Sequence, residues 1–363
     1  MTAADHLAWG VVRPTGAHAS IAARLGDRVL PLRPPAEAGL LGHDLDLRHA
    51  IEEPTLNALI ELGRPAWRAL AERVRHLIDV GHPLMPLAFC EELLPVRIGD
   101  YVDFYASLEH VENFGRLWRP GQPAVHENWR HMPVGYHGRA STVVVGGTPV
   151  RRPRGQVAPG ELAATRALDL ECEVGFVCGP SARGPVAVDD AERHIFGVVL
   201  VNDWSARDIQ RFEYVPLGPF LGKSFATSMS AWITPLDALP RATPRAQDFA
   251  PAEYLRAREP WTLDVALEIE VGGEVLSRPR SSWLYWTPAQ MLAHMTVNGA
   301  TLTAGDLFAS GTVSGSEPGT EGSLGEIGRG ERWLADGEEV VLRGRCGDVE
   351  LGEVRGQVLT AAP

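Results

Sequence analysis

Apolar residues in the first 50 positions occur in short runs that glycine and proline interrupt, as in GVVRP, SIAARLGDRVLPL and GLLGH. Such runs predict short strands joined by turns. The spacing changes to that of a helix over residues 55–62, which end at Gly63, a residue common just after a helix. Pro65 suits the first turn of a second helix. Five apolar residues share one face of that helix: Trp67, Leu70, Val74, Leu77 and Ile78.

The segment 81–100 contains three prolines and predicts a linker between two domains. We place the boundary near residue 90, which divides the chain into residues 1–90 and residues 91–363. A chain of 363 residues is long enough for one large domain and a smaller one.

Beyond residue 95 the patterns are mainly those of strands. Apolar runs, continuous or alternating, predict strands at residues 141–145, 168–177, 196–201 and 261–276. In the last of these, Gly272-Gly273 predicts a tight hairpin turn. Two helices are expected in this part: one covers residues 189–194, and the other begins at a Thr287 cap with Pro288 in the first helical position. The sequence therefore predicts a mainly β second domain.

The chain carries 34 basic and 46 acidic residues, a net charge of −12. This balance disfavours nucleic acid and anionic membrane surfaces as partners. No run of 18 apolar residues predicts a membrane span, and the N-terminus lacks the pattern of a secretory leader. The four cysteines include no CxxC pair, which favours reduced thiols. We therefore expect a cytoplasmic protein.

Acidic and apolar residues alternate in the segment LDLECEV, residues 168–174. In a strand this alternation places Asp169, Glu171 and Glu173 on one face. Taken alone, the segment favours a solvated outer face. The alternative is a site for a hard cation such as Mg²⁺ or Ca²⁺, which oxygen ligands suit.

Two further segments strengthen the alternative. The apolar strand predicted at residues 195–203 ends in Asp203, and a polar and aromatic stretch follows it, which is a common layout of active sites. Asp103 and Tyr105 share a face of another segment, with His110 and Arg119 close behind. Three separate segments therefore place acids next to polar residues.

Other motifs are weaker. The stretch PLGPFLGKSFATS (216–228) positions Lys223 but lacks the GxxxxGK[ST] spacing of a phosphate loop, so this lysine is better suited to stabilising a developing anion. Residues 305–330 are rich in glycine and serine, which favours a flexible surface loop. The G-x-S-x-G and G-x-G-x-x-G motifs are absent, which disfavours a serine hydrolase and a Rossmann dehydrogenase.

Five blocks of the sequence together closely resemble the fumarylacetoacetase family. They are DFYASLEHVENFGRLWRPG (103–121), MPVGYHGRASTVVVGGTPVRRPRGQ (132–156), LDLECEVGF (168–176), HIFGVVLVNDWSARDIQRFEYVPLGPFLGKSFATSMSAW (194–232) and VNGATLTAGDLFASGTVSGSEP (297–318). The similarity is almost continuous over residues 85–330. Related families share the acids, but the PVGYHGRAS and YVPLGPFLGKSF blocks are typical of this family.

The resemblance implies a mainly β fold, with a small N-terminal SH3-like β-barrel domain and a large catalytic β-sandwich roll. It also implies a homodimer. The implied activity is metal-dependent hydrolysis of a carbon–carbon bond in fumarylacetoacetate, a small diketo acid, to fumarate and acetoacetate in tyrosine and phenylalanine catabolism.

Residue roles carry over by motif. The implied ligands of a calcium or magnesium ion are Asp103, Glu171, Glu173 and Asp203, with Lys223 and Thr227 beside Asp203. His110 matches the general base and Glu326 the acid that orients it, although GSLGEIG here departs from the family's usual GSMLEL. Arg207 and Lys223 match groups near the developing negative charge. The implied substrate contacts are Tyr105, Arg119, Tyr136, Gln210, Tyr214 and Thr312.

Two rival functions remain open at this point. Another enzyme of the superfamily, such as an acylpyruvate hydrolase or a decarboxylase/isomerase of catechol breakdown, would keep the acidic ligands. A non-enzymatic β-sandwich that binds a partner would use the carboxylates only to hold a structural ion, and it would not need His110.

Overall fold

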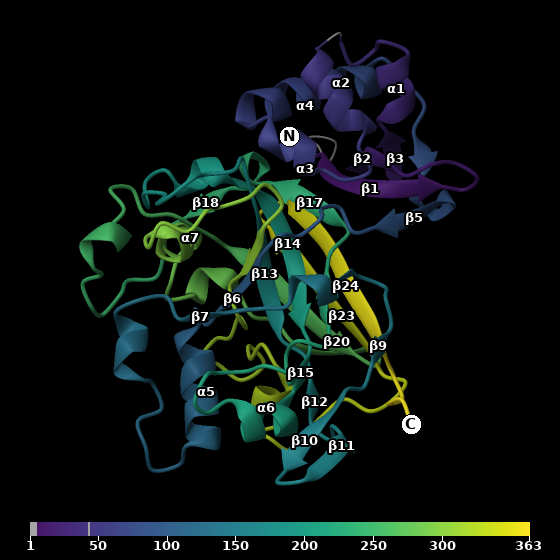
Figure 1. The fold of residues 1–363 in the computed structure, drawn as a ribbon. Coiled ribbons are helices and arrows are strands. Elements are labelled where there is room, and N and C mark those ends of the chain that lie inside the picture. The colour runs from purple at the N-terminus through teal and green to yellow at the C-terminus, as the bar shows by residue number, and fades with distance from the viewer. Residues whose placement is uncertain (1–5, 43) are drawn as a thin grey trace.

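The computed structural model describes residues 6–42 and 44–363. Strands dominate it, as the sequence predicts. They form one 13-stranded sheet, one five-stranded sheet and three two-stranded ribbons among the described residues. The N-terminal elements lie together at the top of Figure 1, and the C-terminal strands run down through the body beneath them.

The large sheet follows the order β4-β3-β2-β1-β17-β14-β13-β22-β6-β7, with β5, β8 and β16 attached beside this path. Its strands are β1 Ala8–Pro14, β2 Ser20–Leu25, β3 Arg28–Pro31, β4 Met85–Pro86, β5 Cys90–Leu93, β6 Tyr101–Phe104, β7 Gly135–His137, β8 Val143–Val145, β13 Cys172–Cys178, β14 Ile195–Asp203, β16 Thr227–Met229, β17 Trp232–Pro235 and β22 Leu307–Ala309.

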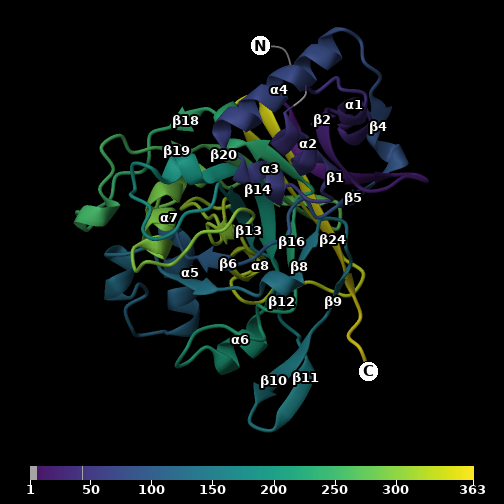
Figure 2. The ribbon, with the colours of Figure 1, turned by 45° about the horizontal axis from the view of Figure 1, so that its top comes forward.

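The five-stranded sheet follows the order β21-β20-β23-β24-β9. Its strands are β9 Val150–Arg151, β20 Val265–Val271, β21 Glu274–Ser277, β23 Glu339–Cys346 and β24 Val349–Leu359. The ribbons are β10 Arg154–Ala158 with β11 Glu161–Ala164, β12 Leu168–Asp169 with β15 Ser205–Ala206, and β18 Arg241–Ala242 with β19 Thr262–Leu263. The β10–β11 hairpin projects from the body in Figure 2.

The helices are α1 Arg33–Glu37, α2 Leu45–Glu52, α3 Asn57–Glu61, α4 Arg64–Asp79, α5 Leu108–Trp118, α6 Arg207–Glu213, α7 Pro288–Thr296 and α8 Leu324–Ile327. None of them, over the residues that the structure describes, is long and apolar enough to cross a bilayer.

The central strand β14 is buried on both faces, which explains its continuous apolar sequence. Val198 and Leu200 join the core that the five-stranded sheet covers, together with Ile269 and Leu342. Val199 and Val201 point to the opposite face and join the core under the N-terminal helices. A charged side chain on either face of this strand is therefore withdrawn from water.

The N-terminal elements are hydrogen-bonded to the rest of the protein through the large sheet. Strand β1 pairs with β17, at Trp9 with Ile233. It also pairs with β5, whose first residue, Cys90, lies at the expected boundary. The segment 81–100, predicted as a linker, thus contains strands β4 and β5. Helices α1 and α2 were not predicted, because their five and eight residues show too few turns of periodic pattern.

The stronger helix signals are confirmed. Helices α3 and α4 lie where the apolar spacing predicts them, with Pro65 in the first turn of α4. Thr287 caps α7 and forms a capping box with Gln290. The expected helix at residues 189–194 is a short 3₁₀ helix, Ala191–His194. Gly272 and Gly273 form the predicted hairpin turn, with φ values of 59° and 86°.

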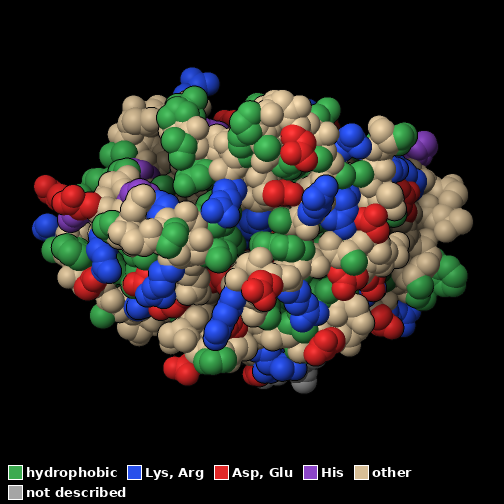
Figure 3. Space-filling model, turned by 90° about the horizontal axis from the view of Figure 1, so that it is seen from below, with side chains coloured by type: hydrophobic (Ala, Val, Ile, Leu, Met, Phe, Trp, Pro, Cys, Tyr) green, Lys and Arg blue, Asp and Glu red, His purple; other side chains and the backbone are tan. Residues whose placement is uncertain are grey.

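The face seen in Figure 3 carries acidic and basic side chains intermingled, with hydrophobic groups between them. On this face the net negative charge of the chain is thus dispersed rather than gathered in one field. Among the described residues, four acids cluster in the interior, in and beside the central strands.

Candidate active site

Three strands of the large sheet, β6, β13 and β14, bring acids to one place. Asp103 lies in β6, Glu173 in β13 and Asp203 at the end of β14, while Glu171 directly precedes β13. Strand β22 joins β6 to β13, since Ala309 pairs with both Asp103 and Gly175. One carboxylate oxygen from each of the four acids lies within 4.8 Å of the others. The acids are between 0 and 4% exposed.

Two cations contact this carboxylate centre, which comprises Asp103, Glu171, Glu173 and Asp203. Lys223 Nζ donates to Asp203 Oδ2 at 2.7 Å and also contacts Glu171. Arg207, the first residue of α6, donates from Nη2 to Glu171 Oε1 at 2.7 Å. Asp203 also accepts hydrogen bonds from two hydroxyls, Tyr136 Oη at 2.8 Å and Thr227 Oγ1 at 3.2 Å.

The loop that carries Lys223 is closed by Glu213. Its Oε1 accepts hydrogen bonds from the backbone N–H of Phe220 and of Gly222, each at 2.8 Å. This closure holds Tyr214 at one end of the loop and Lys223 at the other. Both residues line the same cavity.

The donor set fits a hard divalent cation. Asp103 Oδ1 and both carboxylate oxygens of Glu173 are buried without a hydrogen-bond partner. Burial, followed by repulsion from Asp203, raises the pKa of Asp103 well above its usual range. Burial, followed by repulsion from Asp103 and Asp203, does the same to the pKa of Glu173. Orphaned oxygens and an all-oxygen donor set are what Ca²⁺ or Mg²⁺ requires.

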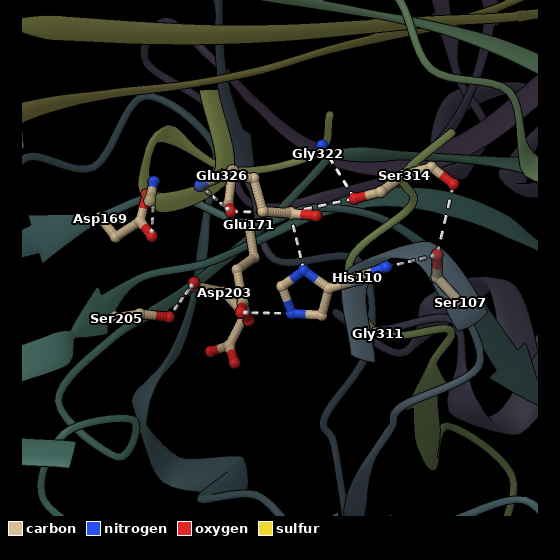
Figure 4. A network of polar contacts seen from close by, with 12 residues as sticks. Ser107, His110, Asp169, Glu171, Asp203, Ser205, Gly311, Ser314, Gly322 and Glu326 are labelled. Carbon is tan, nitrogen blue, oxygen red and sulfur yellow. Dashed lines mark hydrogen bonds and ion pairs between the residues drawn. The ribbon is translucent and has the colours of Figure 1, made fainter. Parts of the chain in front are cut away.

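His110 lies between the carboxylate centre and a second acid (Figure 4). Its Nδ1 is 2.7 Å from Glu326 Oε2, and its Nε2 is 3.4 Å from Glu171 Oε1. Ser107 caps α5 by accepting from the His110 backbone N–H, which sets the ring at the start of the helix. Burial alone lowers the pKa of His110, but Glu326 and Glu171 outweigh burial and raise it to about 9.

Glu326 is held by three other donors. Asn113 Nδ2 donates to Oε1 at 2.9 Å, and the hydroxyls of Ser314 and Ser323 donate to Oε2 at 3.0 and 2.8 Å. Burial raises the pKa of Glu326, but His110, Asn113 and Ser323 outweigh burial, and the net shift is downward. A carboxylate so held keeps the His110 ring in one orientation.

A cavity of about 590 Å³ opens onto this site. All six residues expected to contact substrate line it, namely Tyr105, Arg119, Tyr136, Gln210, Tyr214 and Thr312. Asp103, His110, Glu171, Arg207 and Lys223 line it as well, whereas Glu173, Asp203, Thr227 and Glu326 do not. Thr312 Oγ1 is buried without a partner, so it can serve a ligand. A cavity of about 620 Å³ beside α4 contains none of the clustered acids.

The structure contradicts the solvated face that the acidic segment around residue 171 favours when it is taken alone. Asp169, Glu171 and Glu173 are all buried. Asp169 belongs to the separate strand β12, and its Oδ2 accepts a hydrogen bond from Arg207 Nε at 2.8 Å. It is not one of the four clustered acids. Strict alternation fails because the chain leaves β12 before it enters β13.

The expectation of a flexible surface loop at residues 305–330 is wrong for most of its length. Residues 304–315 and 322–326 are buried, and residues 316–319 are exposed. Ser310 and Val313 donate backbone hydrogen bonds to Val174 and Cys172 of the β13 segment. Small residues permit this approach, because a Cβ at Gly311 would lie 2.0 Å from the Phe104 carbonyl oxygen. The segment thereby places Thr312, Ser314 and Glu326 in the site.

Helix α5, which carries His110, was not predicted, although its sequence contains a signal. Leu108, Val111, Phe114 and Trp118 recur at helical spacing after the Ser107 cap. Asn113, Ser314 and Ser323 were also missed. Ser323, three residues before Glu326, matches a helix-cap pattern that could have indicated α8.

Comparisons with known proteins identify the family. A family model described as fumarylacetoacetate (FAA) hydrolase C-terminal matches residues 101–359, and one described as fumarylacetoacetase N-terminal matches residues 5–86. The chain belongs to the fumarylacetoacetate hydrolase family. It is 44% identical to the fumarylacetoacetase of Rattus norvegicus over 86% of this chain and 85% of the rat protein. It is 38% identical to the fumarylacetoacetase of Arabidopsis thaliana over 99% of this chain and 96% of the Arabidopsis protein.

Two solved structures share the fold. A fumarylacetoacetate hydrolase from Exiguobacterium antarcticum superposes with a TM-score of 0.63 at 19% identity, covering 98% of this chain and 99% of its own. A maleylpyruvate hydrolase from Sphingobium sp. SYK-6, in complex with manganese(II) and pyruvate, superposes with a TM-score of 0.60 at 18% identity. The match covers 97% of this chain and 100% of that one.

The carboxylate centre predicts how Glu173→Gln behaves. The affinity for Ca²⁺ or Mg²⁺ should fall at least about tenfold, because affinity follows the charge of the ligands. The metal-free variant should be at least as stable as metal-free wild type, because one of the repelling acids is gone. Calorimetric titration and thermal unfolding with and without the ion measure both effects.

Asp306→Asn is the matched control, since Asp306 is also buried but lies outside the centre. Unchanged metal affinity in Glu173→Gln would remove this acid from the ligand set.

Proposed function

We propose that this protein is a fumarylacetoacetase, which hydrolyses a carbon–carbon bond of 4-fumarylacetoacetate to fumarate and acetoacetate at the end of tyrosine and phenylalanine catabolism. The observation that carries the proposal is the position of His110 between Glu326 and the carboxylate centre, on the wall of the 590 Å³ cavity. The rat and Arabidopsis relatives with this name support the same substrate.

Asp103, Glu171, Glu173 and Asp203 would hold one Ca²⁺ or Mg²⁺ ion, with Lys223 and Thr227 beside Asp203. When bound, such an ion supplies Lewis-acid polarisation of the diketone and stabilisation of enolate charge. Lys223 Nζ then serves two purposes, since it neutralises Asp203 and also reaches the cavity.

His110 acts as the general base. Its Nε2, on the side of Glu171, takes a proton from water, while Nδ1 keeps its contact with Glu326. The water oxygen adds to the carbonyl carbon, the carbon–carbon bond breaks, and the electron pair stays with the acetoacetate fragment until that carbon is protonated. Glu326 stabilises the imidazolium formed in the first step.

The negative charge that develops on the attacked carbonyl oxygen meets Arg207, Lys223 and Gln210, which line the cavity together. One preorganised donor of this kind contributes about 3–4 kcal/mol to transition-state stability. Arg119 lines the cavity as well and suits a substrate carboxylate. Tyr105, Tyr136, Tyr214 and Thr312 complete the proposed substrate contacts.

We further propose that residues 1–90 are an SH3-like domain and residues 91–363 a catalytic β-sandwich roll, in a cytoplasmic homodimer. The two family models, which match residues 5–86 and 101–359, support the division. The four cysteines are unpaired thiols, which is compatible with a reducing compartment.

The substrate assignment predicts the outcome of an absorbance assay. Loss of fumarylacetoacetate should be fast with the ion present, should stop with a chelator, and should resume when Ca²⁺ or Mg²⁺ is restored. His110→Ala should bind the ion normally but turn over at least about 100-fold more slowly, since it has lost the base. Acylpyruvates, assayed in parallel, should be poor substrates.

Preference for an acylpyruvate would instead support the rival hydrolase of the same superfamily. Near-normal turnover by His110→Ala would exclude the proposed base.

The site also predicts that a bound cation lowers the pKa of His110. Glu171 helps to raise the pKa of His110 to about 9, so the ring is protonated at neutral pH without the ion. With a cation bound to Glu171, this carboxylate would stabilise the imidazolium less, and the positive charge of the ion would oppose protonation of the ring. The pKa of His110 should therefore fall and leave a neutral base. Imidazole NMR titration with and without Mg²⁺ measures the change. His294, which contacts Tyr254 outside the centre, should not respond. An identical His110 pKa in both forms would contradict this coupling.

A further inference from the structure

Asp169 is a buried acid that the proposed reaction does not use. It is 0% exposed and lies beside the segment that carries Glu326 (Figure 4). It does not belong to the carboxylate centre. An ionised group in this position requires several partners, because burial of an unpaired charge costs several kcal/mol.

Both oxygens of Asp169 have two donors. Oδ1 accepts from the backbone N–H of Leu170 and of Leu324, each at 2.8 Å. Oδ2 accepts from Arg207 Nε at 2.8 Å and from the Gly325 N–H at 3.2 Å. One carboxylate thus joins β12, the first turn of α8 and the guanidinium of Arg207. Gly325 permits the contact, since a Cβ there would lie 2.8 Å from Oδ2.

Arg207 has a defined contact at each nitrogen. Asp169 holds Nε, Glu171 holds Nη2 at 2.7 Å, and Gln210 Oε1 accepts from Nη1 at 3.1 Å. The guanidinium carbon lies 4.3 Å from the centre of the Phe114 ring. Of the three acceptor side chains, only Asp169 also accepts hydrogen bonds from the described backbone of α8, which carries Glu326. The anion-stabilising arginine and the acid behind the base are therefore positioned by one side chain.

We propose that Asp169 is a positioning residue that aligns Arg207 with the His110–Glu326 pair. The proposal rests on the roles given to these residues under the proposed function. Without the carboxylate, Arg207 Nε loses its acceptor and the guanidinium can rotate about its remaining contacts. The backbone N–H groups of Leu324 and Gly325 in α8 lose their acceptor as well. Misplacement of a charge-stabilising group by about 1 Å costs up to about 100-fold in rate.

Asp306 offers a matched control. It is also a buried aspartate, 4% exposed, and its oxygens accept from the backbone N–H of Asp100 at 2.9 Å and Thr303 at 2.7 Å. Among the described residues it makes no ion pair and lines no part of the active-site cavity. Asp306→Asn therefore removes a buried charge and its backbone contacts without touching Arg207.

The test compares Asp169→Asn with Asp306→Asn in metal-loaded protein. For Asp169→Asn we expect kcat on fumarylacetoacetate to fall about 10- to 100-fold, with KM and ion affinity within about threefold of wild type, because the arginine acts on charge that develops in the transition state. Asp306→Asn should lose stability but keep its kcat. A kcat for Asp169→Asn within twofold of wild type overturns the proposal, and so does an equal loss in Asp306→Asn.

Arg207→Lys separates this proposal from the proposed function. If Asp169 acts through Arg207, then Asp169→Asn should lower kcat less in the Arg207→Lys background than in wild type. Fully additive effects overturn the proposal. If Arg207→Lys keeps normal kcat, the role assigned to Arg207 itself fails.

Should Asp169→Asn not fold, Gly325→Ala decides. Its backbone is compatible with alanine. The added methyl would lie 2.8 Å from Oδ2 and 2.9 Å from the Phe114 ring, so it displaces the carboxylate and that ring without removing the charge. A lowered kcat with unchanged ion affinity supports the positioning role, and an unchanged kcat overturns it.

Discussion

Mutual repulsion among four buried carboxylates is the constraint on which the site depends. Their oxygens lie within 4.8 Å of one another, and Lys223 and Arg207 supply only part of the compensating charge. Arg207 is also shared with Asp169. Such a group of acids is costly unless a cation binds or some of the acids take up protons. Burial first, and then repulsion from the neighbouring acids, raises the pKa values of Asp103 and Glu173 in the protein alone.

The fold creates this constraint by burying the central strands on both faces. Strand β14 contributes apolar side chains to a core on either side, so Asp203 at its end is buried like the apolar residues before it. The buried segment around Ser310 and Val313 then covers β13 and brings Glu326 behind His110. A cavity wall results in which a base, two cations and the edge of the carboxylate centre face the same space.

Sequence reasoning anticipated part of this arrangement. Alternation around Glu171 and Glu173, and an acid at the end of an apolar strand, were sufficient to indicate a carboxylate site. Single segments could not show burial, and so a solvated face was favoured until several segments were considered together. The grouping of Asp169 with the two glutamates failed because a strand break is invisible to alternation. Composition alone wrongly predicts a flexible surface loop at residues 305–330, because small residues permit close packing as well as flexibility.

The resemblance to the family supplied what local pattern could not. It joined Asp103, Glu171, Glu173 and Asp203 into one set, and the structure brings these four acids together. It also paired His110 with Glu326, which are 216 positions apart and 2.7 Å from each other. Contacts over such sequence distances depend on tertiary structure, which no spacing rule contains.

The most direct measurement of the central claim is a crystal structure of the protein grown with Mn²⁺, a probe that anomalous scattering locates. The account predicts one anomalous peak at about 2.0–2.6 Å from oxygens of Asp103, Glu171, Glu173 and Asp203. A peak elsewhere, or none between these four acids, would contradict it.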